Sequence, residues 1–111
     1  MTELRNVSVL ESLELLAEGA LLLDVREDQE WEAGRAPQAI HISLGSLPDH
    51  LDEIPRNRLI VCVCRSGARS SRAAQYLAEQ GADVANLDGG MLAWTSEGEP
   101  LVADVADPAV I

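Results

Sequence analysis

The sequence predicts an α/β domain with a small parallel β-sheet of about five strands and helices on both faces. Short apolar segments alternate along the chain with amphipathic ones, and glycines end several of them. The apolar runs 20–25 and 59–63 contain few polar residues, as expected of parallel strands that are covered on both sides. Strands that alternate with helices of this length form parallel sheets with helical crossovers.

The first half of the chain contains three expected helices and two expected strands. Ser8 and Glu11 have the spacing of a capping box, which predicts the start of a helix that ends at Gly19. Its apolar residues share one face: Leu13, Leu16 and Ala17. The strand 20–25 follows. The remaining segments are a brief helix at 27–34, a strand at 39–43 and a short helix at 46–54 with Pro48 in its first turn.

The second half begins with the strand 59–63, the strongest strand signal in the chain. A helix follows, with one apolar stripe formed by Ala73, Ala74, Leu77 and Ala78 and an end at Gly81. A strand at 84–87 and a helix at 91–98 complete the domain. We therefore expect one domain over residues 1–101 and a C-terminal tail over 102–111, which drapes over the domain or docks a partner.

Composition narrows the function classes. The 111 residues suit one small domain, and the net charge of −11 argues against binding nucleic acid or an anionic membrane. No apolar stretch approaches the ~20 residues that cross a bilayer, and the N-terminus does not resemble a signal peptide. Two cysteines form no disulfide framework, which favours a reducing cytoplasm. The cysteine and histidine spacing matches no common metal site, and we expect neither metal nor cofactor.

The segment "CRSGARS" joins the strand 59–63 to the next helix and concentrates the positive charge of the chain. All eight basic residues are arginines, and three of them, Arg65, Arg69 and Arg72, lie within eight positions. A helix N-terminus and neighbouring cations favour a thiolate at Cys64. The small residues that follow let backbone amides form an anion nest: Ser66, Gly67 and Ala68. The loop thus combines a nucleophile with an oxyanion pocket.

Several motifs together resemble the rhodanese-domain sulfurtransferases. "CRSGARS" after "LIVCV" resembles their active-site loop, "LLLDVRE" their Asp-x-Arg strand end, and "LDGGMLAW" their Gly-Gly turn and Trp-bearing helix. "EGEPL" resembles the usual ending, so the resemblance covers roughly residues 6–101. Where the family usually has Gly-His-Ile-Pro-Gly-Ala, this chain has "GRAPQAI", with Arg35 for the His and Gln38 for the second Gly. Because Gly34, Pro37 and Ala39 match, we expect the turn to be kept.

The resemblance implies a sulfurtransferase in which Cys64 takes sulfur from an anionic donor such as thiosulfate and holds it as a persulfide. Cyanide in an assay, or a thiol or protein in the cell, would accept it. The backbone amides of residues 65–69 would cradle the persulfide, and Arg65 and Arg69 would bind the anionic end of the donor. The oligomeric state is not predicted.

Two other functions stay open. One is a persulfide carrier or sulfur-relay module without turnover of small acceptors. The other is a phosphatase or arsenate reductase, which on the same fold uses a longer Cys-x5-Arg loop. Here Arg69 follows Cys64 by five positions and Ser70 by six, which is the shorter, sulfurtransferase spacing.

Other polar and aromatic residues near the expected site are interpreted as structural. Cys62 should point to the same side as Cys64, one layer deeper in the core. The Asp24 and Arg26 pair should be a structural ion pair, although Arg26 and Glu30 also have helical i,i+4 spacing. Arg72 either adds to the positive potential that attracts the anionic donor or only neutralises nearby carboxylates. Trp31 and Trp94 are expected to be core or half-buried anchors.

Overall fold

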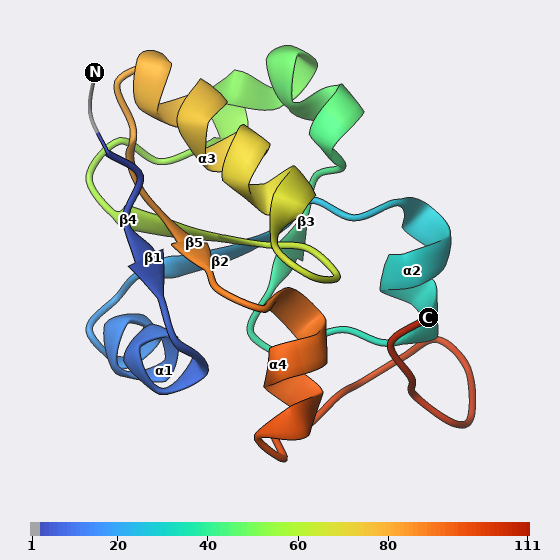
Figure 1. Cartoon of the computed structure of the whole chain (residues 1–111). Coiled ribbons are helices and arrows are strands. Elements are labelled where there is room, and N and C mark those ends of the chain that lie inside the picture. The colour runs from blue at the N-terminus through green and yellow to red at the C-terminus, as the bar shows by residue number, and fades with distance from the viewer. Residues whose placement is uncertain (1–2) are drawn as a thin grey trace.

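The computed structural model describes residues 3–111 and contains a five-stranded sheet with the order β1-β5-β4-β2-β3 (Figure 1). All neighbouring strands pair in parallel. The strands are β1 (Asn6–Val7), β2 (Leu21–Asp24), β3 (Ile40–His41), β4 (Leu59–Val63) and β5 (Asp83–Leu87). The expected α/β architecture is confirmed; residues 1 and 2 of the expected 1–101 domain lie outside the described residues.

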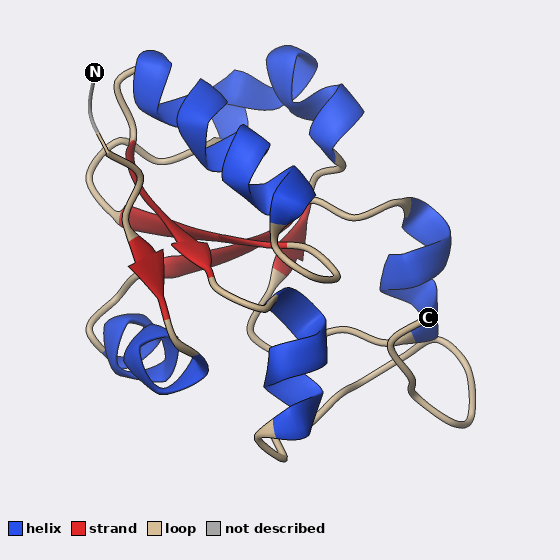
Figure 2. Ribbon diagram, viewed as in Figure 1, coloured by secondary structure: helices blue, strands red, loops and turns tan. Residues whose placement is uncertain are grey.

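Helices cover both faces of the sheet, as predicted (Figure 2). The helical segments are α1 (Val9–Ala17), α2 (Asp28–Ala33), the 3₁₀ segment η1 (Leu44–Glu53), α3 (Ala68–Glu79) and α4 (Gly90–Ser96). α3 and η1 lie on one face, and α1 and α4 lie on the other (Figure 1). α2 lies beyond the sheet, next to the C-terminal tail. Within residues 3–111, no helix has both the length and the apolar character needed to cross a membrane.

Alternate residues of the central strands pack into two separate apolar cores, one on each face of the sheet. On the α3 side, Leu23 and Cys62 are fully buried against Leu77. On the α4 side, Leu22 and Val61 are fully buried with other residues of that core. Because both faces of β2 and β4 are covered, their sequences read as continuous apolar runs rather than alternating ones.

Trp94 of α4 is fully buried, and its indole N–H donates to the carbonyl of Pro100 at 2.9 Å. Trp31 of α2 is half-buried and stacks on the ring of His41, with ring centroids 4.8 Å apart. Both tryptophans are therefore structural anchors, as predicted.

Three local expectations need correction. β1 was not predicted, because two residues at a sheet edge carry no periodic signal. The segment expected as a short helix at 46–54 is part of the 3₁₀ segment η1, which is interrupted by non-helical backbone at His50. Ala78 is exposed rather than part of the buried stripe of α3, and Ser70 is buried in its place.

Candidate active site

Cys64 lies at the carboxyl end of β4, where a parallel sheet presents its ligand-binding edge. The chain turns directly from this strand into α3. Gly67 is the N-cap residue of α3 and has φ +118°, a conformation that side-chain-bearing residues rarely adopt. The turn brings backbone amides at the start of α3 toward the Cys64 sulfur.

Hydrogen bonds to the sulfur favour its ionised form. The Gly67 amide donates to Cys64 Sγ at 3.1 Å, and the buried Ser70 hydroxyl donates at 3.2 Å. Burial raises the pKa of Cys64, but the Ser70 hydroxyl and the amides of Ser70, Gly67 and Ser66 lower it, and the resulting pKa lies below the ordinary value of a thiol. Cys64 is 1% exposed, so its sulfur lies within the loop rather than on the surface.

Ser70 was not predicted as a site residue. It occupies the buried stripe that Ala73, Ala74 and Leu77 continue at helical spacing. A hydroxyl in an otherwise apolar stripe was a readable signal, because a buried hydroxyl needs a hydrogen-bond partner. Here that partner is the sulfur of Cys64.

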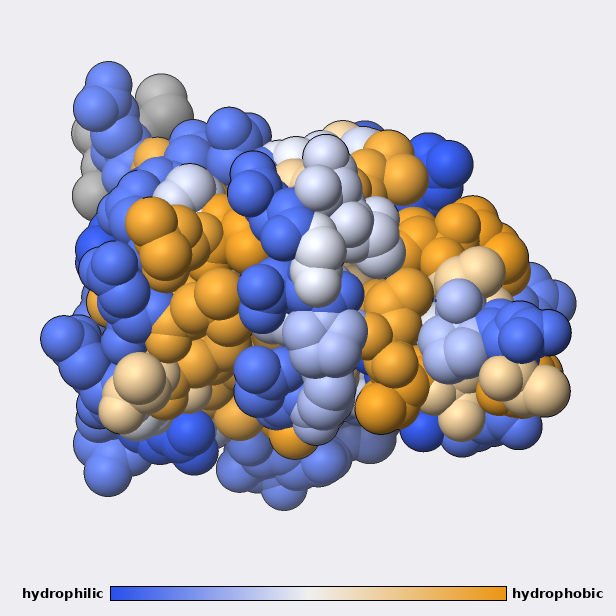
Figure 3. Space-filling model, turned by 90° about the horizontal axis from the view of Figure 1, so that it is seen from below, coloured by the Kyte–Doolittle hydropathy of each residue, from blue (hydrophilic) through white to orange (hydrophobic). Residues whose placement is uncertain are grey.

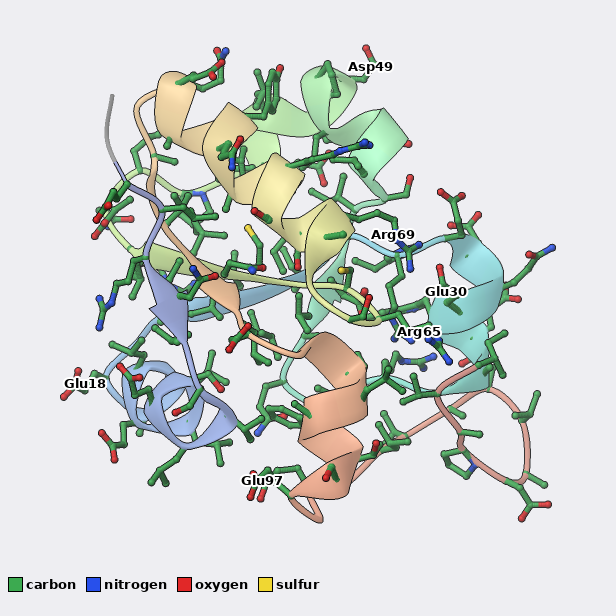
Figure 4. The ribbon with its side chains drawn as sticks, viewed as in Figure 1. Glu18, Glu30, Asp49, Arg65, Arg69 and Glu97 are labelled. Carbon is green, nitrogen blue, oxygen red and sulfur yellow. The ribbon has the colours of Figure 1, made fainter. Side chains whose placement is uncertain are left out.

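Arg69 points to α2 and forms a two-pronged ion pair with Glu30 (Figure 4). Its Nη1 and Nη2 donate to Glu30 Oε1 and Oε2 at 2.6 and 2.8 Å. The hydrogen bond from Arg69 lowers the pKa of Glu30 despite the opposing effect of burial, and Glu30 in turn raises the pKa of Arg69. The alternative pairing of Arg26 with Glu30 is wrong, because Glu30 pairs with Arg69.

Arg65 has the opposite environment. It is exposed, and its Nε donates to the carbonyl of Ile111 at 3.1 Å. Within residues 3–111, no Asp or Glu side chain forms an ion pair with it. Ser66 and Ala68 are also exposed, whereas Gly67 and Arg69, the other predicted donor-binding residues, are half-buried. The arginines were expected to lower the pKa of Cys64. The groups that lower this pKa most are instead the Ser70 hydroxyl and the backbone amides described above.

The N-terminus of α4 clamps the loop from the other side. The amides of Met91 and Leu92 donate to the carbonyls of Cys64 and Arg65 at 2.8 and 3.0 Å. A Cβ on Gly90 would approach the Cys64 carbonyl oxygen to 2.4 Å, and φ at this residue is +58°. Residue 90 must therefore be glycine for the backbones to meet, which accounts for the Gly-Gly turn.

The second thiol has no part in this arrangement. Cys62 is fully buried in the core on the α3 side, as predicted. Burial, with a smaller contribution from Cys64, raises the pKa of Cys62 to about 12. Cys62 therefore remains a neutral thiol at physiological pH, and both cysteines are free.

A buried ion pair fixes the start of the β2–α2 connection. Asp24 and Arg26 are both 0% exposed and pair at 2.8 Å, and Arg26 Nη2 also donates to the Gly34 carbonyl at 2.7 Å. These contacts confirm the structural role predicted for the Asp-x-Arg segment. The turn after it also survives the Gln38 substitution, since the Ala39 amide still donates to the Ala36 carbonyl at 3.1 Å.

The tail packs on α2, and Arg35 holds it there. The backbones of Arg35 and Val102 exchange two hydrogen bonds of 2.9 Å, and the guanidinium pairs with Asp104 at 2.8 Å. The same guanidinium lies over the Trp31 ring, 4.8 Å from its centroid. Arg35, which stands where the family usually has histidine, thus anchors residues 102–111. The tail drapes over the domain, which is one of the two arrangements expected for it.

Apolar side chains of the tail nevertheless remain at the surface. Val102, Val105 and Ile111 are 42%, 54% and 56% exposed. Figure 3 shows the lower side of the molecule of Figure 1, where apolar surface is broken by hydrophilic side chains. The contact between Ile111 and Arg65 brings this surface to the edge of the Cys64 loop.

Comparison with known proteins identifies the family. The rhodanese-like domain family matches residues 8–97. The chain belongs to this family. A sulfurtransferase of Allochromatium vinosum is 44% identical over 87 residues, which cover 78% of this chain and 81% of the relative. The thiosulfate sulfurtransferase GlpE of Pseudomonas syringae pv. syringae is 36% identical over 95 residues, covering 85% and 90% of the two chains.

Solved structures agree with this assignment. A rhodanese-like domain protein from Staphylococcus aureus has a TM-score of 0.81 at 33% identity and covers 92% of this chain and 100% of its own. The reduced CoADR-RHD of Bacillus anthracis has a TM-score of 0.83 at 36% identity, with 89% of this chain matching 18% of that protein. This rhodanese-like domain is therefore a member of a sulfurtransferase family by sequence and by fold.

Proposed function

We propose that this rhodanese-like domain is a thiosulfate sulfurtransferase that works through a persulfide on Cys64. The observation that carries the proposal is the set of hydrogen bonds on the Cys64 sulfur, from the Gly67 amide at 3.1 Å and the Ser70 hydroxyl at 3.2 Å. Such hydrogen bonds favour the thiolate, which is the nucleophilic form. The relatedness to GlpE favours thiosulfate as the donor.

The reaction proceeds in two displacements. The Cys64 thiolate attacks the outer sulfur of thiosulfate, a new S–S bond forms, and the original S–S bond breaks as its electron pair leaves with sulfite. The products are the Cys64 persulfide anion and sulfite, so charge and atoms balance. Cyanide then attacks the outer persulfide sulfur and leaves as thiocyanate, which restores the Cys64 thiolate. In the cell a thiol or a protein takes the place of cyanide.

The loop supplies binding as well as the nucleophile. Arg65 is exposed and pairs with no Asp or Glu side chain within residues 3–111, so its guanidinium is open to the sulfonate end of the donor. Arg69 follows on the α2 side, with its charge shared with Glu30. The backbone of Ser66, Gly67 and Ala68 completes the cradle for the anionic intermediate. Metal and cofactor are not required by this mechanism.

Steady-state formation of thiocyanate from thiosulfate and cyanide tests this proposal. We expect turnover in the wild type, none in Cys64→Ser, and turnover in Cys62→Ala, which removes the other thiol. Absence of thiocyanate despite one sulfur loaded per chain would favour the persulfide-carrier function instead. Hydrolysis of an aryl phosphate that Cys64→Ser abolishes would favour the phosphatase function, against the loop length.

A reducing compartment suits this chemistry, because both cysteines are free and Cys64 must stay a thiolate. We therefore propose that the protein transfers sulfur in the cytoplasm, from a small anionic donor to a thiol or protein acceptor. Residues 1–101 would form the catalytic domain, and residues 102–111 a tail held by Arg35.

A further inference from the structure

We propose that Glu30 is a specificity-determining residue that selects the sulfur donor by its charge. It acts through Arg69, and it disfavours the dianion thiosulfate relative to donors that carry one negative charge. The inference rests on the proposed function, because it concerns the donor that Cys64 attacks. Thiosulfate remains a donor, but the loop stabilises its second negative charge less than two unpaired arginines would.

The ion pair that carries this inference is well formed and partly shielded. Both guanidinium nitrogens of Arg69 reach a separate carboxylate oxygen of Glu30, at 2.6 and 2.8 Å. The Glu30 side chain is 15% exposed and that of Arg69 is 32% exposed. A two-pronged pair in this geometry keeps its orientation better than an ordinary surface pair. Figure 4 shows Glu30 on α2 with Arg69 reaching it from α3 and Arg65 close by.

Pairing changes the charge that a donor meets. The loop carries two arginines, but the carboxylate of Glu30 offsets the charge of Arg69 at short range. No Asp or Glu side chain forms an ion pair with Arg65 within residues 3–111, and its Nε contacts the main-chain oxygen of Ile111. Glu30 therefore offsets about one of the two positive charges that the loop arginines carry. The Coulomb energy of a donor scales with its charge, so a dianion loses twice as much as a monoanion when one positive charge is offset.

Methanethiosulfonate is a matched probe for this effect. Like thiosulfate, it carries its outer sulfur on an oxidised sulfur, but a methyl group replaces one charged oxygen, so the ion has charge −1. Attack by the Cys64 thiolate forms the same persulfide, and the electron pair of the broken S–S bond leaves with methanesulfinate. The ratio of kcat/KM for thiosulfate to that for methanethiosulfonate therefore reports the charge preference of the loop.

The experiment measures this ratio in the wild type, Glu30→Gln and Glu30→Ala, with cyanide as the acceptor and thiocyanate as the readout. Both variants remove the charge, and Glu30→Gln keeps an oxygen for Arg69. We expect the ratio to rise roughly threefold to tenfold in both, as for one partly screened charge. Glu32→Gln is the control, because Glu32 is exposed on the same helix and its loss changes the net charge equally.

An unchanged ratio in both variants would overturn the inference. So would an equal fall for the two donors, because a residue that only holds Arg69 in place affects both donors alike. A rise in Glu32→Gln of the same size would attribute the effect to net charge rather than to the ion pair. Thermal unfolding of each variant confirms that a folded protein is compared. If the wild type used neither donor, the proposed function itself would fail, and the inference with it.

Discussion

The Ser70 hydroxyl contributes to the reactivity of Cys64, and Ser70→Ala tests how much. In the native protein the hydroxyl donates to Cys64 Sγ at 3.2 Å, and Ser70 is 0% exposed, so water does not replace it readily. The hydrogen bond stabilises the thiolate more than the thiol. Its removal should therefore raise the pKa of Cys64, and the pH at which the sulfur becomes reactive should move upward.

The geometry sets the size of this effect. A hydrogen bond to a charged group typically contributes about 1.5–3 kcal/mol. The same hydroxyl lies 3.3 Å from the Gly67 carbonyl, so in the neutral form its proton can bond there instead. That alternative bond reduces the free-energy difference that the hydroxyl makes between the thiolate and the thiol of Cys64, and it favours the lower end of the range. At about 1.4 kcal/mol per pKa unit, we expect an upward shift of about one unit.

The rate of alkylation by iodoacetamide, followed against pH, measures the midpoint directly. Cys62 does not interfere, because it is fully buried and its pKa is raised to about 12. Ser71→Ala is the control, since Ser71 is the next residue of α3 and the hydrogen bonds to the sulfur within residues 3–111 come from Gly67 and Ser70 instead. A midpoint in Ser70→Ala that equals the wild type, or an equal shift in Ser71→Ala, would refute this reasoning. In the wild type the midpoint should lie below that of a free thiol.

Three further variants test other parts of the account. Arg65→Ala should lower kcat/KM for thiosulfate on the order of tenfold, since a charge-assisted contact is lost; unchanged kinetics would contradict its binding role. Gly90→Ala should lower the free energy of unfolding by about 2–4 kcal/mol in urea titrations, because its Cβ would meet the Cys64 carbonyl oxygen at 2.4 Å; a neutral result would disprove the clamp. Arg35→Ala should speed hydrogen exchange across 102–111, and unaltered exchange would show that other contacts hold the tail.

Much of the fold was predictable because its signals are local. The apolar run at 59–63 coincides with β4, and the Ser8 and Glu11 spacing marks the start of α1, where both hydrogen bonds of the capping box are present. β1 was missed because it pairs with β5, about eighty residues later in the chain, and two residues show no pattern. The 3₁₀ character of η1 depends on packing that the sequence around Pro48 does not specify.

Some features of the site were likewise predictable from the local sequence, and others depend on contacts between distant residues. The position of Cys64 at a strand end and the nest of small residues follow from neighbouring residues, so they were predictable. The Glu30 and Arg69 pair joins residues 39 positions apart and depends on where α2 packs, which no local pattern states. For the same reason, the contact of Arg65 with Ile111 and the anchoring of the tail by Arg35 were visible only in the folded chain.

Intact mass spectrometry after incubation with thiosulfate tests the central claim most directly. We expect that the wild type gains the mass of one sulfur atom, that cyanide removes it as thiocyanate, and that Cys64→Ser gains nothing. Cys62→Ala should gain the sulfur as the wild type does. A wild type that gains no sulfur, or a Cys64→Ser variant that still gains it, would contradict the persulfide on Cys64.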